Sequence, residues 1–127
     1  MKQIKVSEAT PLQLNWLVAK CEDESIRIES GVVRFALSQF TNDYDRYAPS
    51  TDWAQGGPII EREQVELCMH NNEEGTPVIW KAAPYWDIGA EGYGPTPLIA
   101  AVRCYVTSKL GDVVEIPEEL TCNSPSN

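Results

Sequence analysis

The sequence predicts an α+β fold: a single domain in which a mostly antiparallel sheet of about five strands carries two amphipathic helices and two long aromatic loops. Two long segments repeat apolar residues at helical spacing, and both begin with Thr-Pro-Leu. Shorter segments alternate apolar and polar residues and come in pairs separated by turn residues. The chain has 127 residues, which suits one domain. We expect that domain at 1–120, followed by a flexible tail at 121–127.

The first helix is expected after a short alternating strand at 2–6, and it should end near Glu22. Thr10 precedes the helix as its N-cap, Pro11 suits the first helical position, and Gln13 completes a capping box. Apolar residues at i, i+3, i+4 and i+7 predict one buried face. That face consists of Leu14, Leu17, Val18 and Cys21.

A second apolar face of the same helix holds Leu12 and Trp16. A helix that is apolar on two sides is either enclosed by the core or uses one side as an interface. A symmetric homodimer through Leu12 and Trp16 is therefore an open alternative to burial.

Two β-hairpins are predicted from alternating segments. The first joins 25–29 to 32–36 through Ser30-Gly31, because glycine readily adopts the positive φ that a two-residue turn requires. The second joins 65–70 to 77–82 through a polar turn.

The second long helix is predicted at 97–110. Thr96 is its N-cap, Pro97 occupies its first position, and Gly111 ends it. The segment at 113–116 is expected to form an edge strand.

The long loops are expected at 41–58 and 84–95, where no period is sustained but aromatic residues recur. In the first loop, Ser50 can cap a short turn that ends at Gly56-Gly57, and Pro58 can begin another. Aromatic rings offer flat contact area and neighbouring polar groups can orient a ligand, so the two loops together could form a binding pocket. The candidate binding residues are Tyr44, Tyr47, Ser50, Thr51, Asp52, Trp53, Gln55, Tyr85, Trp86 and Tyr93. The alternative is that these rings only anchor long loops to the core.

The charge balance excludes some partners and favours others. The chain has a net charge of −9 at pH 7, and no two of its ten basic residues are adjacent. Direct binding to nucleic acid or to an anionic membrane is therefore not expected. A basic protein partner fits the charge, including a DNA-binding protein for which the carboxylates would imitate phosphate, although acidity also serves solubility.

No motif predicts an enzyme, a metal site or a cofactor. Glu66, Cys68 and His70 share one face of a predicted strand, but side chains two residues apart on a strand are too widely separated to form a site alone. The single histidine leaves no triad in view. Asp52, with Ser50 and Thr51, supports the alternative of a small-ligand binder or weak hydrolase, whereas a helix cap explains Asp52 equally well.

Three stretches of the chain resemble the NinX-type family of small bacteriophage proteins, a family without an assigned activity. They are 14–21, 47–63 (YAPSTDWAQGGPIIERE) and 94–112 (GPTPLIAAVRCYVTSKLGD). The resemblance implies a phage or prophage protein that acts in the cytoplasm of the bacterial host, and it carries over no catalytic residue. We therefore expect a non-catalytic accessory protein that binds a host or phage protein through its aromatic loops and acidic surface.

Overall fold

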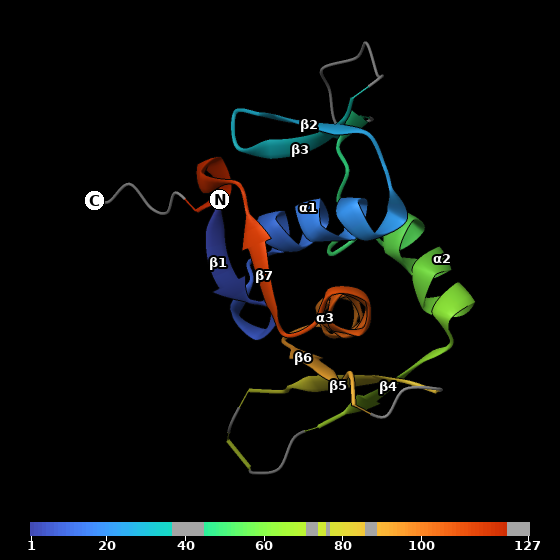
Figure 1. The fold of residues 1–127 in the computed structure, drawn as a ribbon. Coiled ribbons are helices and arrows are strands. Elements are labelled where there is room, and N and C mark those ends of the chain that lie inside the picture. Colours follow the sequence, from blue (N-terminus) through green and yellow to red (C-terminus); the bar gives the residue numbers. More distant parts are fainter. Residues whose placement is uncertain (37–44, 71–73, 76, 86–88, 122–127) are drawn as a thin grey trace.

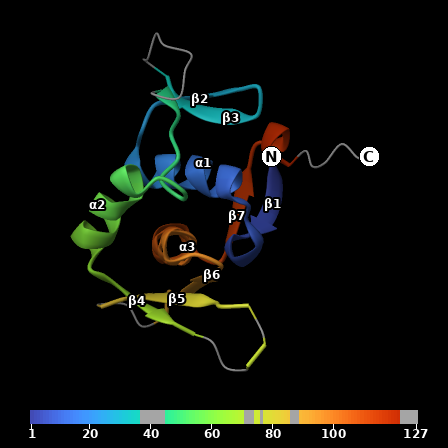
Figure 2. The ribbon, with the colours of Figure 1, turned by 180° about the vertical axis from the view of Figure 1, so that it is seen from behind.

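The computed structural model describes residues 1–36, 45–70, 74–75, 77–85 and 89–121 of the chain. Within these residues it has three helices and seven strands, so the predicted α+β class is confirmed. Helix α3 (Pro97–Leu110) lies at the centre, with α1 (Pro11–Glu22) crossing it on one side (Figure 1). Helix α2 (Trp53–Glu63) and the pair of strands β1 and β7 lie on opposite sides of α3, as the reverse view also shows (Figure 2).

The caps of α1 and α3 confirm the predicted helix starts. The Thr10 hydroxyl accepts from the Gln13 amide at 3.3 Å, while the Gln13 side chain accepts from the Thr10 amide at 2.9 Å. The Thr96 hydroxyl accepts from the Ile99 amide at 3.1 Å. These bonds satisfy donors that the first helical turn leaves free, which explains why Thr-Pro begins both helices.

Helix α2 corrects the prediction of two short turns inside a loop at 41–58. The helix begins after Asp52, whose carboxylate accepts from the Ala54 amide at 3.0 Å, and it continues through Gly56, Gly57 and Pro58. Gly56 does not end the helix: a Cβ there would lie 2.3 Å from the Pro49 carbonyl oxygen, so the glycine permits close packing. Residues 41–44 lie outside the described residues.

The strands form three separate sheets, so the single sheet of about five strands was a wrong prediction. All the described pairings are antiparallel: β1 with β7, β2 with β3, and β4 with β5 and β6. Helices α1 and α3 lie between the β2–β3 hairpin and the β4–β5–β6 sheet, and the β1–β7 pair lies beside them (Figure 1). The strands are β1 (Lys2–Lys5), β2 (Ile26–Glu29), β3 (Val32–Phe35), β4 (Val65–Met69), β5 (Trp80–Pro84), β6 (Gly92–Gly94) and β7 (Val113–Ile116).

Both predicted hairpins form, and the predicted loop at 84–95 contains an unexpected strand. Ser30 and Gly31 have φ of 55° and 75°, which is the conformation that a tight two-residue turn requires. In the second hairpin the return strand starts at Trp80, later than predicted. Strand β6 lies directly against α3, because a Cβ on Gly92 would lie 2.4 Å from the Ala100 carbonyl oxygen.

Buried side chains lie on both sides of α3. Leu14, Leu17 and Val18 of α1 are buried as predicted, in a cluster that includes residues of α3. On the other side, small residues such as Ala82 and Ala100 let the helix approach the β4–β5–β6 sheet closely. Among the described residues, no helix is long and apolar enough to cross a bilayer.

Candidate functional site

Tyr47 and Ser50 face the interior, so the expectation that they present an outward surface was wrong. The Tyr47 side chain is 6% exposed, and its ring meets the edge of Phe35 with 5.1 Å between centroids. Ser50 is fully buried, and its amide and hydroxyl both donate to the Asn15 side-chain oxygen, at 3.0 and 2.7 Å. An apolar ring and a satisfied hydrogen-bond pair therefore fix this segment to the core.

The next residues of the predicted site begin α2. Asp52 is exposed and caps the helix, which is the structural alternative that the sequence offered. Gln55 bridges the preceding segment, since its amide nitrogen donates to the Arg46 carbonyl at 2.9 Å and its oxygen accepts from the Ala48 amide at 2.7 Å. Thr51 and Trp53 remain exposed. An exposed, capping Asp52 beside a buried Ser50 gives no support to a hydrolytic site.

Among the described aromatic candidates, Trp53, Tyr85 and Tyr93 do not converge on one pocket. The Tyr85 amide donates to the carbonyl of Gln64, at the end of α2, whereas Trp53 begins that helix. A helix of 11 residues separates them by about 16 Å. Tyr93 lies on β6, where its ring contacts His70 with 5.3 Å between centroids. Tyr44 and Trp86 lie outside the described residues.

The two residues of the predicted dimer interface differ in exposure. Leu12 is 41% exposed. Trp16 packs partly against the core, and the Lys20 ammonium lies 5.4 Å from its ring centroid. The homodimer stays a prediction.

No group of three potential metal ligands occurs within the described residues. Glu66 and Cys68 are exposed on β4. The His70 ring packs on Tyr93.

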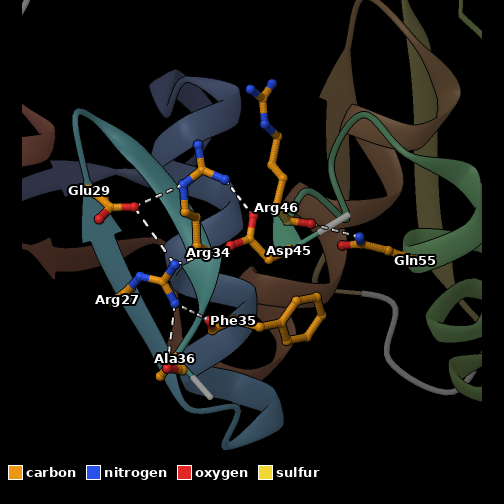
Figure 3. A network of polar contacts seen from close by, with 8 residues as sticks. All are labelled: Arg27, Glu29, Arg34, Phe35, Ala36, Asp45, Arg46 and Gln55. Atoms are coloured by element: carbon orange, nitrogen blue, oxygen red, sulfur yellow. Dashed lines mark hydrogen bonds and ion pairs between the residues drawn. The ribbon is translucent and has the colours of Figure 1, made fainter. Parts of the chain in front are cut away.

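A buried carboxylate network joins the segment after residue 44 to the β2–β3 hairpin, and sequence reasoning missed it (Figure 3). The Asp45 side chain is completely buried between two guanidinium groups. Arg27 contacts one carboxylate oxygen at 3.1 Å and Arg34 contacts the other at 2.5 Å. Glu29 lies 3.3 Å from Arg34 and completes the network.

This network is architectural. Each Asp45 oxygen has a charged partner, and Arg27 also donates to the Phe35 carbonyl at 2.6 Å. The Tyr47 amide donates to the Val33 carbonyl at 2.8 Å, so the segment follows the hairpin closely. Because the Asp45 side chain is completely buried between two arginines, it is not accessible to a ligand. Asp45 lies between Tyr44 and Arg46 in the sequence, and no local pattern distinguishes it from a loop residue.

A second charged cluster connects the C-terminal halves of all three helices. Arg62 of α2 donates to both oxygens of Glu22, at 3.0 and 2.7 Å, and the Tyr105 hydroxyl also donates to Glu22. The bond from Arg62 lowers the pKa of Glu22. Burial, reinforced by Glu22, raises the pKa of Tyr105. Burial also raises the pKa of the nearby Cys21 thiol to about 11, which disfavours a reactive thiolate.

A groove of about 790 Å³ separates the β1–β7 pair from the β5–β6 edge. Its walls come from 5–7, 77–79, 112–113 and β6 with its flanking residues, together with Arg103 and Thr107 of α3. Large apolar side chains on these walls are exposed, namely Val78 (43%), Ile79 (42%), Tyr93 (40%) and Val113 (46%). The groove therefore combines a concave shape with an apolar surface. We call it the β1–β6 groove.

Arg103 supplies the groove with a cation that has no counter-ion among the described residues. Its two terminal nitrogens donate to the carbonyls of Tyr93 and Ala9, at 2.7 and 2.8 Å. Its Nε is buried and has no hydrogen-bond partner within the described part of the chain. Burial lowers the pKa of this guanidinium. The groove residue Glu91 instead pairs with Lys81 at 3.4 Å.

Sequence reasoning recognised Tyr93 but not the role of Arg103. The available signal was its set of helical neighbours, because Ile99, Ala100 and Val106 are all apolar and buried. A basic residue surrounded by such neighbours predicts a partly buried cation.

Comparison with known proteins identifies one family. A model of the family described as "Bacteriophage P22, NinX" matches residues 5–109, which include α1, α2, β6 and most of α3. Comparison with curated proteins gives no match.

Proposed function

Because the chain belongs to the NinX family of bacteriophage proteins, we propose that it is a non-catalytic accessory protein that binds a host or phage protein. Its place of action is the cytoplasm of the bacterial host. The binding surface is the β1–β6 groove, with Tyr93 as its aromatic contributor from the sequence-predicted set. The observation that carries this proposal is the concentration of exposed apolar side chains around one concave surface.

The groove suits a segment of a protein partner. Protein interfaces combine an apolar centre with a polar rim, and aromatic residues are enriched at their centres. Val78 and Ile79 precede β5 on one wall, whereas Val113 lies on the other. An extended segment between these walls would cover side chains that are otherwise in water.

A capture experiment with matched variants tests this function. The variant carrying Val78→Asn and Val113→Asn makes both walls polar without changing charge or a buried side chain. Trp53→Asn with Leu110→Asn is the control, since these residues are comparably exposed but lie outside the groove, at 52% and 44%. We expect the groove variant to lose at least about tenfold of a partner captured from phage-infected bacterial lysate, as expected for a loss of apolar contacts. The control should retain it.

The opposite pattern would overturn the assignment. Loss of capture in the control variant alone would place the binding surface at the start of α2 and the end of α3, where Trp53 and Leu110 are exposed. Equal capture by both variants and the unmodified chain would exclude the groove as a protein-binding surface.

We also propose homodimerisation through Leu12 and Trp16, which rests on the exposure of Leu12 beside a half-buried Trp16. Light scattering of the unmodified chain should give the mass of a dimer, and Trp16→Ala should give that of a monomer. A monomeric unmodified chain excludes this interface.

A further inference from the structure

We propose that the β1–β6 groove selects an acidic peptide segment and that Arg103 binds a carboxylate of that segment. The inference rests on the proposed function and adds the chemistry of the partner. It comes from the joint position of two features. One is a concave apolar surface of peptide-binding size, and the other is a guanidinium on that surface without an anionic partner in the described residues.

The hydrogen bonds of Arg103 leave part of its capacity unused. A guanidinium has five N–H donors, and carbonyls of Tyr93 and Ala9 accept from two of its nitrogens. Carbonyl oxygens carry only partial charge, so they do not neutralise the cation. A partly buried cation gains most from a full negative charge, because water screens it weakly.

The same two bonds hold the guanidinium in place before a ligand arrives. Tyr93 belongs to β6, and Ala9 lies just before α1, so Arg103 is held between two segments that are far apart in the sequence. A fixed planar guanidinium is suited to carboxylate recognition and loses little conformational freedom on binding. The groove is therefore preorganised for an anion.

Three other charged side chains line the groove, namely Lys5, Glu91 and Asp112. Lys5 lines the groove as a second cation. Of the two acidic residues on its walls, Glu91 is engaged by Lys81, and Asp112 has no ion pair with Arg103 among the described residues. The overall charge of −9 does not forbid an acidic ligand, since screening limits charge effects to about 8 Å at physiological salt.

The apolar walls favour a peptide over a simple anion. Val78, Ile79 and Val113 would contact aliphatic or aromatic side chains on either side of the acidic residue. We therefore expect a ligand in which one Asp or Glu stands between apolar residues in an extended segment.

Selection from a random-peptide display library on the unmodified chain supplies the probe. The selected peptide is synthesised twice, once as selected and once with every Asp and Glu replaced by Asn and Gln. Isothermal titration then measures both peptides on the unmodified chain and on Arg103→Gln. We expect the acidic peptide to bind at least about tenfold more tightly than its amide copy on the unmodified chain, and within about threefold of it on Arg103→Gln.

A second pair of variants keeps the test decisive if Arg103→Gln is poorly folded. Val78→Lys and Val78→Glu change charge at one exposed wall position. The acidic peptide should bind more tightly to Val78→Lys than to Val78→Glu, by about tenfold, and the amide copy should not distinguish them.

The experiment distinguishes failure of the carboxylate inference from failure of the proposed groove function. If selected peptides lose binding with Val78→Asn and Val113→Asn but bind equally as acid and amide, the groove function stands and the carboxylate inference is overturned. If selection yields no peptide whose binding requires Val78 and Val113, the proposed function and the carboxylate inference both fail.

Discussion

Asp45 and Arg103 are both charged residues withdrawn from water, yet their surroundings are opposite. Asp45 lies between two arginines, with no solvent-exposed side-chain surface and both oxygens engaged (Figure 3). Arg103 has two carbonyl partners, a buried Nε without a partner in the described residues, and a groove beside it. A saturated charge fixes the chain to itself, whereas an unsaturated charge beside a cavity is available to a ligand.

This contrast explains why the large polar network is not the functional site. The Asp45 network has more charged groups, but its partners already neutralise one another. Arg34 Nε also has no hydrogen-bond partner among the described residues, but it lies 3.3 Å from Glu29, whereas Arg103 has no ion pair there. Incomplete pairing is thus the more useful guide to a binding surface.

The largest expected loss of stability comes from removing the Asp45 carboxylate. Asp45→Ala leaves Arg27 and Arg34 facing each other without their shared carboxylate. We expect a loss of about 3–5 kcal/mol in the free energy of unfolding, as for other broken buried pairs. Urea denaturation measures it. A loss below about 1 kcal/mol would show that solvent reaches this network easily.

The wall of the groove gives the next largest effect. Gly92→Ala puts a Cβ within 2.4 Å of the backbone of α3, and backbone atoms cannot move aside as a flexible side chain can. We expect a loss of about 1–3 kcal/mol in unfolding free energy. Gly31→Ala is a control in open space whose cost reflects positive φ alone. Equal losses in the two variants would contradict the close contact between β6 and α3.

Glu22 is a third charged residue, and it is paired but partly solvated. Its replacement should therefore destabilise the fold less than that of Asp45. The pKa of Glu22 is lowered by the hydrogen bond from Arg62, so its contribution to stability is present above the ordinary carboxyl pKa and lost as pH falls through the lower value. We expect Glu22→Gln to cost about 1 kcal/mol near pH 7 and less near pH 4. A cost that grows on acidification would contradict the assigned pairing.

The smallest expected effect on stability comes from removing the Arg103 guanidinium. Arg103→Met removes two hydrogen bonds to carbonyls but also removes a desolvated cation. These effects oppose one another, so we expect a change within about 1 kcal/mol. Thermal denaturation compared with Asp45→Ala makes the contrast direct. A loss as large as that of Asp45→Ala would assign Arg103 a purely architectural role.

Local sequence patterns predicted the parts of the fold that depend on local chemistry. The caps at Thr10 and Thr96 and the Ser30-Gly31 turn involve neighbours within a few residues, and all three form. The start of α2 at Asp52 was missed because Gly56, Gly57 and Pro58 are typical of turns. Gly56 lies in close contact with Pro49, and no local pattern reveals that packing.

The site was predicted only in part, for the same reason. Tyr93 was selected as an aromatic loop residue and does line the groove. Tyr47 was selected by the same rule and is buried, with its ring packed edge to face against Phe35 of β3. Aromatic content alone cannot distinguish an anchor from a docking residue. Arg103 and Ala9 are separated by 94 residues in the sequence, and only the fold brings them into contact.

Nuclear magnetic resonance of the arginine Nε–H groups tests the central contrast most directly. On addition of the selected acidic peptide, we predict a large shift of the Arg103 Nε–H signal and stationary signals from Arg27 and Arg34. The amide copy of the peptide should leave all three in place. Movement of the Arg27 and Arg34 signals with an unchanged Arg103 signal would contradict the account.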